Sequence, residues 1–207
     1  FTYDLLVRQE MFRNELSNTM FSISGAYRVS EGLIMKMSAG RTFRFPELNA
    51  LFWNLGGNPE LLPENGVSAE AELCYTSKKV TTIISMYAMN NDNLIQWRPI
   101  DGTWTPENFQ KAEIKGTELK VNYQVLKTTN RSLSLNGSYS FNDSQVRVND
   151  DWITNSYRPK HSARGGVYVQ SKWLNVSYVG RFLSGRNSTL NSQEDLLGFY
   201  ISSLSLS

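Results

Sequence analysis

The chain holds few side chains with the reactivity that catalysis requires. Its one histidine, His161, lies between Lys160 and Ser162, and no nucleophile-elbow motif surrounds any serine. Nucleophilic catalysis needs a general base within hydrogen-bond reach of the nucleophile. A lone histidine at the start of an expected strand is better explained by a structural position. The sequence therefore predicts that the protein is not an enzyme.

The sequence also offers few residues that could bind a metal ion. One histidine and one cysteine, Cys74, cannot supply the ligand spacing of a zinc site. The runs Asn91-Asp-Asn93 and Asn149-Asp-Asp151 carry the oxygen ligands that Ca²⁺ prefers. Such runs are more often solvated loop tips, and we expect no metal site and no cofactor.

Alternation of apolar and polar residues with a period of two is the dominant pattern of the chain. Between residues 118 and 127, Leu119, Val121, Tyr123 and Val125 fall on one face of an extended segment. The expected strands are longer than the usual five or six residues, as a tilted strand crossing a bilayer of about 30 Å must be. Such runs predict about ten strands, at residues 1–14, 20–29, 32–43, 66–77, 79–97, 110–127, 131–145, 162–171, 173–184 and 197–207.

The expected connections alternate between short and long. Tight turns are predicted at 29–32, 76–79, 127–130 and 170–172, and long connectors at 42–65, 91–109, 145–161 and 185–196. Short turns on one rim and long loops on the other are typical of an outer-membrane β-barrel. The pattern therefore favours an all-β, antiparallel, up-and-down transmembrane barrel. Greek-key connections of a soluble sandwich would break the order.

Bulk composition agrees with this class and excludes another. The chain has 21 Lys and Arg against 19 Asp and Glu, so no basic footprint for nucleic acid exists. No run reaches the roughly 20 apolar residues of a membrane helix, whereas a membrane barrel alternates its apolar residues and looks polar on average.

Two segments carry a specific family resemblance. The run from Ser38 to Glu64, S-A-G-R-T-F-R-F-P-E-L-N-A-L-F-W-N-L-G-G-N-P-E-L-L-P-E, and the run from Trp104 to Glu118 resemble, in collinear order, motifs of TonB-dependent receptor barrels. Tyr157-Arg-Pro-Lys-His161 is similar to a later element of the family. The matching positions include Arg44, Pro46, Gly57, Asn58, Pro59, Pro63, Glu64, Asn108, Lys111, Gly116 and Glu118.

The resemblance implies a fold and a function for the parent protein. It implies that residues 1–207 are a fragment of a 22-strand barrel domain, an open curved sheet without the plug domain and the last strands. It implies a bacterial outer-membrane receptor that imports a large scarce nutrient of the cobalamin or iron-siderophore class. The implied partners are outer-membrane lipid, the nutrient, and a TonB-type energising protein that acts through the missing plug.

Binding by loop residues is the local chemistry that remains. Family logic places the ligand on the long outer loops and in the upper lumen, where aromatic side chains beside polar ones suit a bulky amphipathic solute. Loop packing or anchoring at the membrane interface would explain the same residues. The candidates are Phe52, Trp53, Asn54, Trp97, Arg98, Trp104, Asp150 and Trp152.

Two other protein classes remain open from the sequence. A secreted all-β binding module, such as a sandwich or lectin, would bury the apolar face of each strand against a second sheet. An outer-membrane barrel enzyme would need His161 in a catalytic set. The structure distinguishes a secreted all-β module from a membrane barrel, because only the secreted module has a second layer over the apolar faces of the strands.

Overall fold

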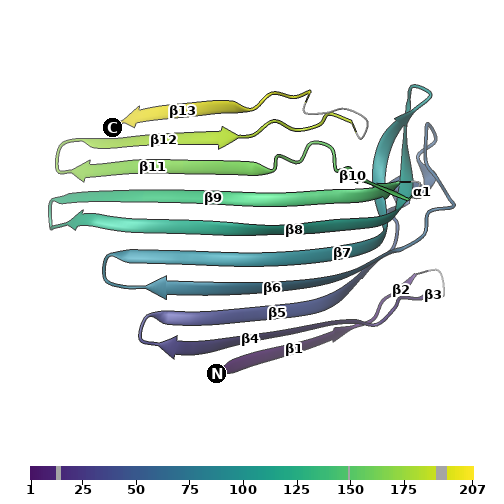
Figure 1. Cartoon of the computed structure of the whole chain (residues 1–207), viewed down its shortest axis with the longest axis horizontal. Coiled ribbons are helices and arrows are strands. Elements are labelled where there is room, and N and C mark those ends of the chain that lie inside the picture. Colours follow the sequence, from purple (N-terminus) through teal and green to yellow (C-terminus); the bar gives the residue numbers. More distant parts are fainter. Residues whose placement is uncertain (13–14, 149, 190–194) are drawn as a thin grey trace.

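One long antiparallel sheet forms most of the computed structural model, which describes residues 1–12, 15–148, 150–189 and 195–207 (Figure 1). The chain runs up and down through the sheet, because each strand pairs with the next one in sequence. The ten strands on this path match the predicted number and class. They are β1 (Thr2–Arg8), β4 (Met20–Ser30), β5 (Leu33–Arg44), β6 (Glu64–Thr76), β7 (Val80–Ile100), β8 (Thr103–Lys127), β9 (Arg131–Val148), β11 (His161–Ser171), β12 (Asn175–Leu183) and β13 (Phe199–Leu206).

Four further elements lie off this path. β10 (Asp151–Thr154) folds back on the end of β9, and β2 (Met11–Phe12) pairs with β3 (Glu15–Leu16). The connector between β5 and β6 holds a short helix, α1 (Leu48–Phe52). The strand predicted at residues 1–14 is thus divided between β1 and β2, and its residues 13–14 lie outside the described residues. No described helix combines the length and the apolar character needed to cross a membrane.

The two rims of the sheet differ as the spacing predicts. Residues 31–32, 77–79, 128–130 and 172–174 make tight turns at one rim, here called the turn rim. The connecting residues 45–63, 101–102, 155–160, 184–189 and 195–198 lie at the opposite rim, here called the loop rim. The predicted long connector at 91–109 is wrong, because β7 and β8 continue through it as a paired hairpin.

Sterics at the hairpin tip explain this difference. Residues Asp101 and Gly102, with φ of 49° and 81°, form the two-residue connection. Two positive φ values are the signature of a tight hairpin turn whose twist matches that of the strands, and Asp-Gly is a preferred sequence for it. The hairpin therefore projects beyond the sheet at the loop rim (Figure 1).

The register sorts the strand residues onto two faces. Leu5, Ile23, Ala39, Ala69 and Ala88 are successive cross-strand partners, and partners in a ladder share a face. This face, here called the apolar face, also carries Leu119, Tyr139, Ala163 and Phe182 at the other end of the sheet.

The opposite face, here called the polar face, carries the charges that the alternation assigns to it. Lys36 pairs with Glu72 at 2.7 Å, and Lys120 pairs with Glu118 at 2.9 Å. Tyr87, a cross-strand partner of Glu70, also lies on this face. Its other cross-strand partner is Gly116, whose missing side chain leaves room for the phenol ring.

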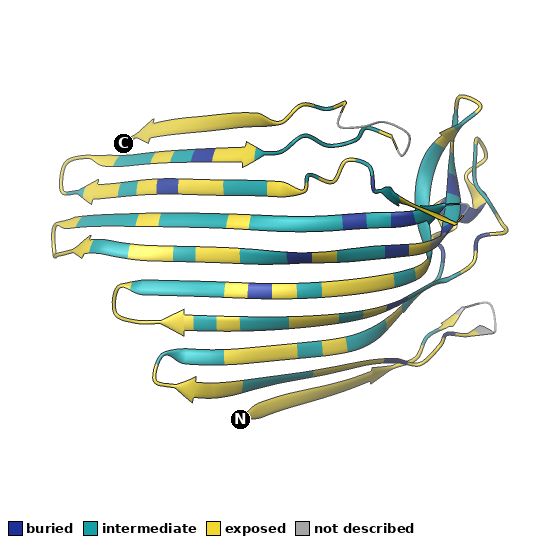
Figure 2. Cartoon of the chain, viewed as in Figure 1, coloured by how far each residue is buried: buried dark blue, intermediate teal, exposed yellow. Residues whose placement is uncertain are grey.

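No second sheet or helix layer covers the apolar face of the described strands (Figures 1 and 2). Ile23, Met37 and Met86 keep 53%, 57% and 59% of their surface exposed, as lipid-facing residues would in the absence of lipid. On β6 this face is uncharged from Val67 to Tyr75. At about 3.3 Å per residue and a tilt near 40°, these residues span roughly 23 Å, close to the apolar band of an outer-membrane barrel. A sandwich would have buried this face, so that alternative is excluded.

The loop rim is held together by an ion pair that joins three strands. Arg44 at the end of β5 donates from Nε and Nη2 to the Glu64 carboxylate of β6, at 2.9 and 2.6 Å. The same carboxylate accepts the backbone N–H of Ile95 on β7 at 2.7 Å. Bidentate guanidinium–carboxylate pairs fix geometry as well as charge, so the pair sets where the projecting hairpin leaves the sheet.

The first prediction tests which face meets lipid. Leu119→Arg in the intact receptor is expected to lower the free energy of unfolding by about 2–4 kcal/mol, because a cation near the bilayer midplane loses its hydration. Denaturant titration of the receptor folded into lipid vesicles measures this change. Asn122→Arg, on the polar face of the same strand, is the matched control and should change stability by about 0.5 kcal/mol or less. Equal losses in both variants would exclude the assignment of the faces.

The second prediction tests the ion pair at the rim. Glu64→Ala removes the acceptor of the Ile95 amide, so its hydrogen exchange should become about tenfold faster. A hydrogen bond to a charged group contributes about 1.5–3 kcal/mol, and the partial exposure of Arg44 lowers that value. Glu47→Ala is the control, since Glu47 lies 3.8 Å from Arg44 and is 73% exposed. An unchanged Ile95 exchange rate would show that other contacts hold the hairpin.

Candidate functional site

The projecting part of the β7–β8 hairpin forms one wall of a pocket at the loop rim. Within it Trp97 pairs with Pro106, and Pro99 pairs with Trp104. Trp97, Pro99 and Trp104 give this wall rigid, largely apolar surfaces, because proline fixes its own φ and the indole ring has few rotamers.

The connector between β5 and β6 packs against the hairpin and supports it. Ala50 and Leu51 of α1 and Leu61 form a buried cluster, against which Ile95 and Trp97 pack. The ring of Trp53 meets the ring of Trp97 edge to face, with centroids 5.4 Å apart. This connector therefore fixes the orientation of Trp97 from outside the pocket.

Hydrogen bonds from asparagine side chains lock the same connector in place. Asn58 donates from Nδ2 to the carbonyl of Pro106 at 3.2 Å. Asn108 exchanges hydrogen bonds with the backbone of Leu62, at 2.8 and 3.0 Å, and donates to the carbonyl of Asn93 at 2.7 Å. Side chains of the connector and the hairpin thus satisfy backbone groups of each other.

The backbone passes close to itself at Gly57, one of the family-motif residues, and this explains why a glycine stands there. A Cβ on Gly57 would lie 2.9 Å from the carbonyl oxygen of Trp53, and Gly57 donates its N–H to that oxygen at 2.6 Å. Pro46 is buried, while Pro59 is exposed and Pro63 accepts a 3.4 Å hydrogen bond from Asn93 Nδ2. The geometry gives these motif residues a supporting position beneath the site.

The pocket itself has a volume of about 750 Å³. It lies between the hairpin, the segment that follows β10, and the connector that follows β12. A volume of this size is within the usual range for small-molecule sites. Its lining residues are Ile95, Gln96, Trp97, Arg98, Pro99, Trp104, Asn155, Ser156, Tyr157, Arg158, Ser188 and Thr189.

A buried asparagine connects the walls of this pocket. The side chain of Asn155 accepts a hydrogen bond from Gln96 Nε2 at 3.1 Å and donates to Ser144 Oγ at 3.3 Å. Its backbone N–H donates to the carbonyl of Ser144 at 2.9 Å. The segment after β10 is therefore tied to both the hairpin and the sheet.

Tyr157 lies at the opposite wall in a strained backbone conformation. Its φ is 58°, a region that costs a bulky residue free energy unless its surroundings hold it there. The N–H of Tyr157 donates to the carbonyl of Asn187 at 2.7 Å, which joins this segment to the connector after β12. Tyr157 is 60% exposed and lines the pocket.

The charge of the lining is positive. Arg98 pairs with Glu107 at 3.0 Å, and its guanidinium lies 5.6 Å from the centre of the Phe109 ring. Arg158 is exposed and has no carboxylate within 4.0 Å among the described residues. A guanidinium without a carboxylate partner, beside three aromatic residues, suits an anionic group on a bulky ligand.

The predicted ligand-binding residues fall into two groups. Trp97, Arg98 and Trp104 line this pocket together. Phe52, Trp53 and Asn54 do not line it, since they belong to the supporting connector.

The remaining two candidates, Asp150 and Trp152, also lie outside the lining. Asp150 pairs with Arg147 at 2.8 Å, and Trp152 is paired in β10.

Most lining residues that sequence reasoning missed come from the segment after β10 and from the connector after β12, and the others, Ile95, Gln96 and Pro99, lie on β7. Tyr157 and Arg158 belong to the motif that ends at His161, and that motif could have identified them. Asn155, Ser156, Ser188 and Thr189 carry no recognisable signal, because ordinary polar loop residues become pocket residues only through the fold.

Three family-motif residues lie away from the pocket. Lys111 is the cross-strand partner of Asp92 and Arg147, and Gly116 lies opposite Tyr87. Glu118 is on the polar face, paired with Lys120. Their positions along β8 extend the motif from the hairpin down into the sheet.

Other chemistry is not supported within the described ranges. No group of three or more His, Cys, Asp and Glu residues that could hold a metal ion occurs among the described residues, and Asn149 of the second acidic run lies outside them. His161 begins β11, and its Nδ1 lies 2.7 Å from the hydroxyl of Tyr139. It therefore holds the structural position that its sequence context suggests.

Comparison with solved structures shows where such a sheet occurs. The structure resembles the copper transporter OprC, with a TM-score of 0.77, 18% identity, and coverage of 93% of this chain and 31% of that one. It also resembles the FrpB iron transporter from Neisseria meningitidis, with a TM-score of 0.68, 12% identity, and coverage of 99% and 34%. A ferric enterobactin receptor from Pseudomonas aeruginosa matches with a TM-score of 0.68 and 15% identity over 91% of this chain and 32% of that one. These likenesses confirm the fold.

Sequence comparison identifies relatives of the same kind. The vitamin B12 transporter BtuB of Photobacterium profundum is 31% identical over 170 residues, which are 79% of this chain and 27% of that protein. A BtuB of Vibrio vulnificus is 35% identical over 90 residues, or 42% and 15% of the two chains. The family model for the TonB dependent receptor-like β-barrel matches residues 2–207. The chain therefore belongs to the TonB-dependent receptor β-barrel family, whose barrels lie in the bacterial outer membrane.

Proposed function

We propose that this chain forms part of the wall of an outer-membrane receptor that binds a large, scarce nutrient and imports it. Family membership and relatives named as vitamin B12 transporters support this function. Structural neighbours named for copper, iron and ferric enterobactin leave several solutes open. The proposed substrate class is cobalamin or an iron-siderophore complex.

The single observation that carries the proposal is the pocket at the loop rim. Three aromatic residues, Trp97, Trp104 and Tyr157, offer flat surfaces for stacking, and Arg158 offers a cation for an anionic group. Bulky amphipathic solutes are recognised by this combination of apolar contact and a few placed polar groups. The loop rim is the side on which outer-membrane barrels carry their long external loops.

Transport requires more than the elements described. The chain spans 27% of the length of its relative BtuB from Photobacterium profundum, and β1 and β13 each have one unpaired edge in the sheet. Unsatisfied backbone groups are costly in lipid, so we infer that further strands close the barrel. A plug domain inside it would couple the barrel to a TonB-type protein, and the ten-strand sheet alone would not transport.

Substitution of pocket residues in the whole receptor tests the function. Trp104→Ala and Arg158→Ala are each expected to weaken binding of the transported solute about tenfold or more, because buried aromatic and arginine contacts dominate binding free energy. Binding of cyanocobalamin and of ferric enterobactin is measured by titration calorimetry for each variant.

The matched control is Trp173→Ala at the turn rim. Trp173 is 86% exposed and lies at the opposite end of the sheet from the pocket (Figure 1), so its removal should leave affinity unchanged. If the unsubstituted receptor binds neither solute, the proposed substrate class is wrong. If it binds one with an affinity that Trp104 and Arg158 do not affect, the pocket is not the binding site.

A further inference from the structure

Residues 155–160, here called the strap, connect the end of β10 to the start of β11, and the first four of them line the pocket at the loop rim. Both ends of the strap are bonded to β9. The N–H of Asn155 donates to the carbonyl of Ser144 at 2.9 Å, and the carbonyl of Lys160 accepts the N–H of Asn142 at 2.9 Å. The place of Arg158 in the pocket therefore depends on the few backbone angles between these two ends.

Asn155 makes the stronger of the two attachments, because its side chain adds to the backbone bond. Its amide oxygen accepts from Gln96 of β7 at 3.1 Å, and its amide nitrogen donates to Ser144 of β9 at 3.3 Å. Asn155 is 5% exposed and Ser144 is 2% exposed. A buried polar atom without a partner costs free energy, so these bonds fix the amide between the hairpin and the sheet.

The middle of the strap is held in a conformation that it would not adopt alone. Tyr157 has a φ of 58°, and a strained angle of this kind persists only where surrounding contacts hold it. One such contact is the bond from its own N–H to the carbonyl of Asn187 at 2.7 Å. The other is the attachment at Asn155, two residues earlier. Pro159 limits Arg158 to an extended backbone, so a change of φ at Tyr157 would swing Arg158 as a unit.

We propose that Asn155 is a positioning residue for Arg158. By holding the strained strap, it places the guanidinium where an anionic group of the bound solute meets it. Trp97 and Trp104 belong to the hairpin wall and Arg158 to the strap, so the bond from Gln96 to Asn155 sets the spacing between the stacking surfaces and the cation. This inference rests on the proposed function, since it concerns the same pocket.

A double-mutant cycle in the intact receptor tests the proposal. Asn155→Ala should weaken binding of the solute that the receptor takes, cyanocobalamin or ferric enterobactin, about fivefold, the usual effect of a lost buried hydrogen bond. In the Arg158→Ala background the same substitution should change the affinity less than about twofold, because the residue that it positions is gone. Titration calorimetry measures both factors. Equal factors in the two backgrounds would overturn the proposal, since they would show that Asn155 acts independently of Arg158.

The matched control for the cycle is Asn58→Ala. Asn58 also donates from its side chain across the loop rim, to the carbonyl of Pro106 at 3.2 Å, but it supports the hairpin and not the strap. Its substitution should change the affinity by the same factor with and without Arg158. Ser144→Ala is a second variant, for use if Asn155→Ala folds poorly. It removes one of the two side-chain bonds, so a smaller loss is expected, and again only where Arg158 is present.

Hydrogen exchange of the receptor without solute gives a second readout. The Tyr157 amide should exchange about tenfold faster in Asn155→Ala, because the strap that holds it is released. The Ile95 amide, held by Glu64 at 2.7 Å, should keep its rate, which shows that the rest of the loop rim is intact. An unchanged Tyr157 rate would overturn the proposal. If Trp104→Ala and Arg158→Ala both leave the affinity unchanged, the proposed binding site is wrong, whereas a loss in Arg158→Ala with equal Asn155 factors rejects only this inference.

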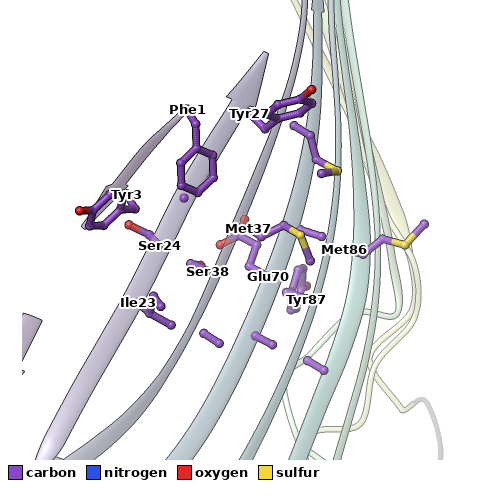
Figure 3. A pocket seen from close by; sticks show the side chains of 16 residues that line it. Phe1, Tyr3, Ile23, Ser24, Tyr27, Met37, Ser38, Glu70, Met86 and Tyr87 are labelled. Carbon is purple, nitrogen blue, oxygen red and sulfur yellow. The ribbon is translucent and has the colours of Figure 1, made fainter. Parts of the chain in front are cut away.

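A groove on the apolar face supplies a control for adsorption of a bulky solute outside the pocket. It has a volume of about 620 Å³, and Figure 3 shows Met37 and Met86 along it. Ala69 lines this groove and lies away from the strap. Ala69→Leu narrows the groove, so it should leave both the affinity for the solute and the Tyr157 exchange rate unchanged.

Discussion

Every backbone N–H and C=O that enters a bilayer must find a partner within the protein, because hydrocarbon offers none. An antiparallel meander meets this requirement strand by strand, and it makes side chains alternate between two environments. The continuous register from β1 to β13 is the physical expression of that constraint. The apolar band from Val67 to Tyr75, the charged pairs on the polar face and the difference between the rims all follow from it.

The constraint ends where the strands leave the membrane, and the functional geometry begins there. β7 and β8 extend past the loop-rim ends of β5 and β6, which are marked by Arg44 and Glu64. In this projecting part, side chains support the hairpin in place of neighbouring strands. Glu64 binds the Ile95 amide, and Asn58 and Asn108 bind backbone groups of the hairpin and its connector. These side-chain hydrogen bonds support a pocket wall that lies outside the sheet.

The sequence predicts features that repeat along a strand, but it does not predict features that depend on contacts between residues distant in sequence. The alternation at Leu119, Val121 and Tyr123 reveals a strand because lipid and water impose a period of two. Residues 91–109 are predicted as a long connector but form a paired hairpin; Asp101-Gly102 is a turn signal there, although Pro99 and Pro106 interrupt the alternation. Asn155 could not be identified in advance, since its importance arises from Gln96 and Ser144, which are distant in sequence.

The low sequence identity of the structural neighbours has a related cause: most strand positions require only an apolar or a polar residue, whereas a few require a particular one. A TM-score of 0.77 at 18% identity is reasonable where one face must only be apolar and the other only polar. Residue type matters where geometry is specific, as at the fork of Arg44 and the small volume of Gly57. At such positions one exchange removes a hydrogen bond or closes a backbone contact. A few residues at the loop rim can therefore change the local geometry while the sheet that presents them stays the same.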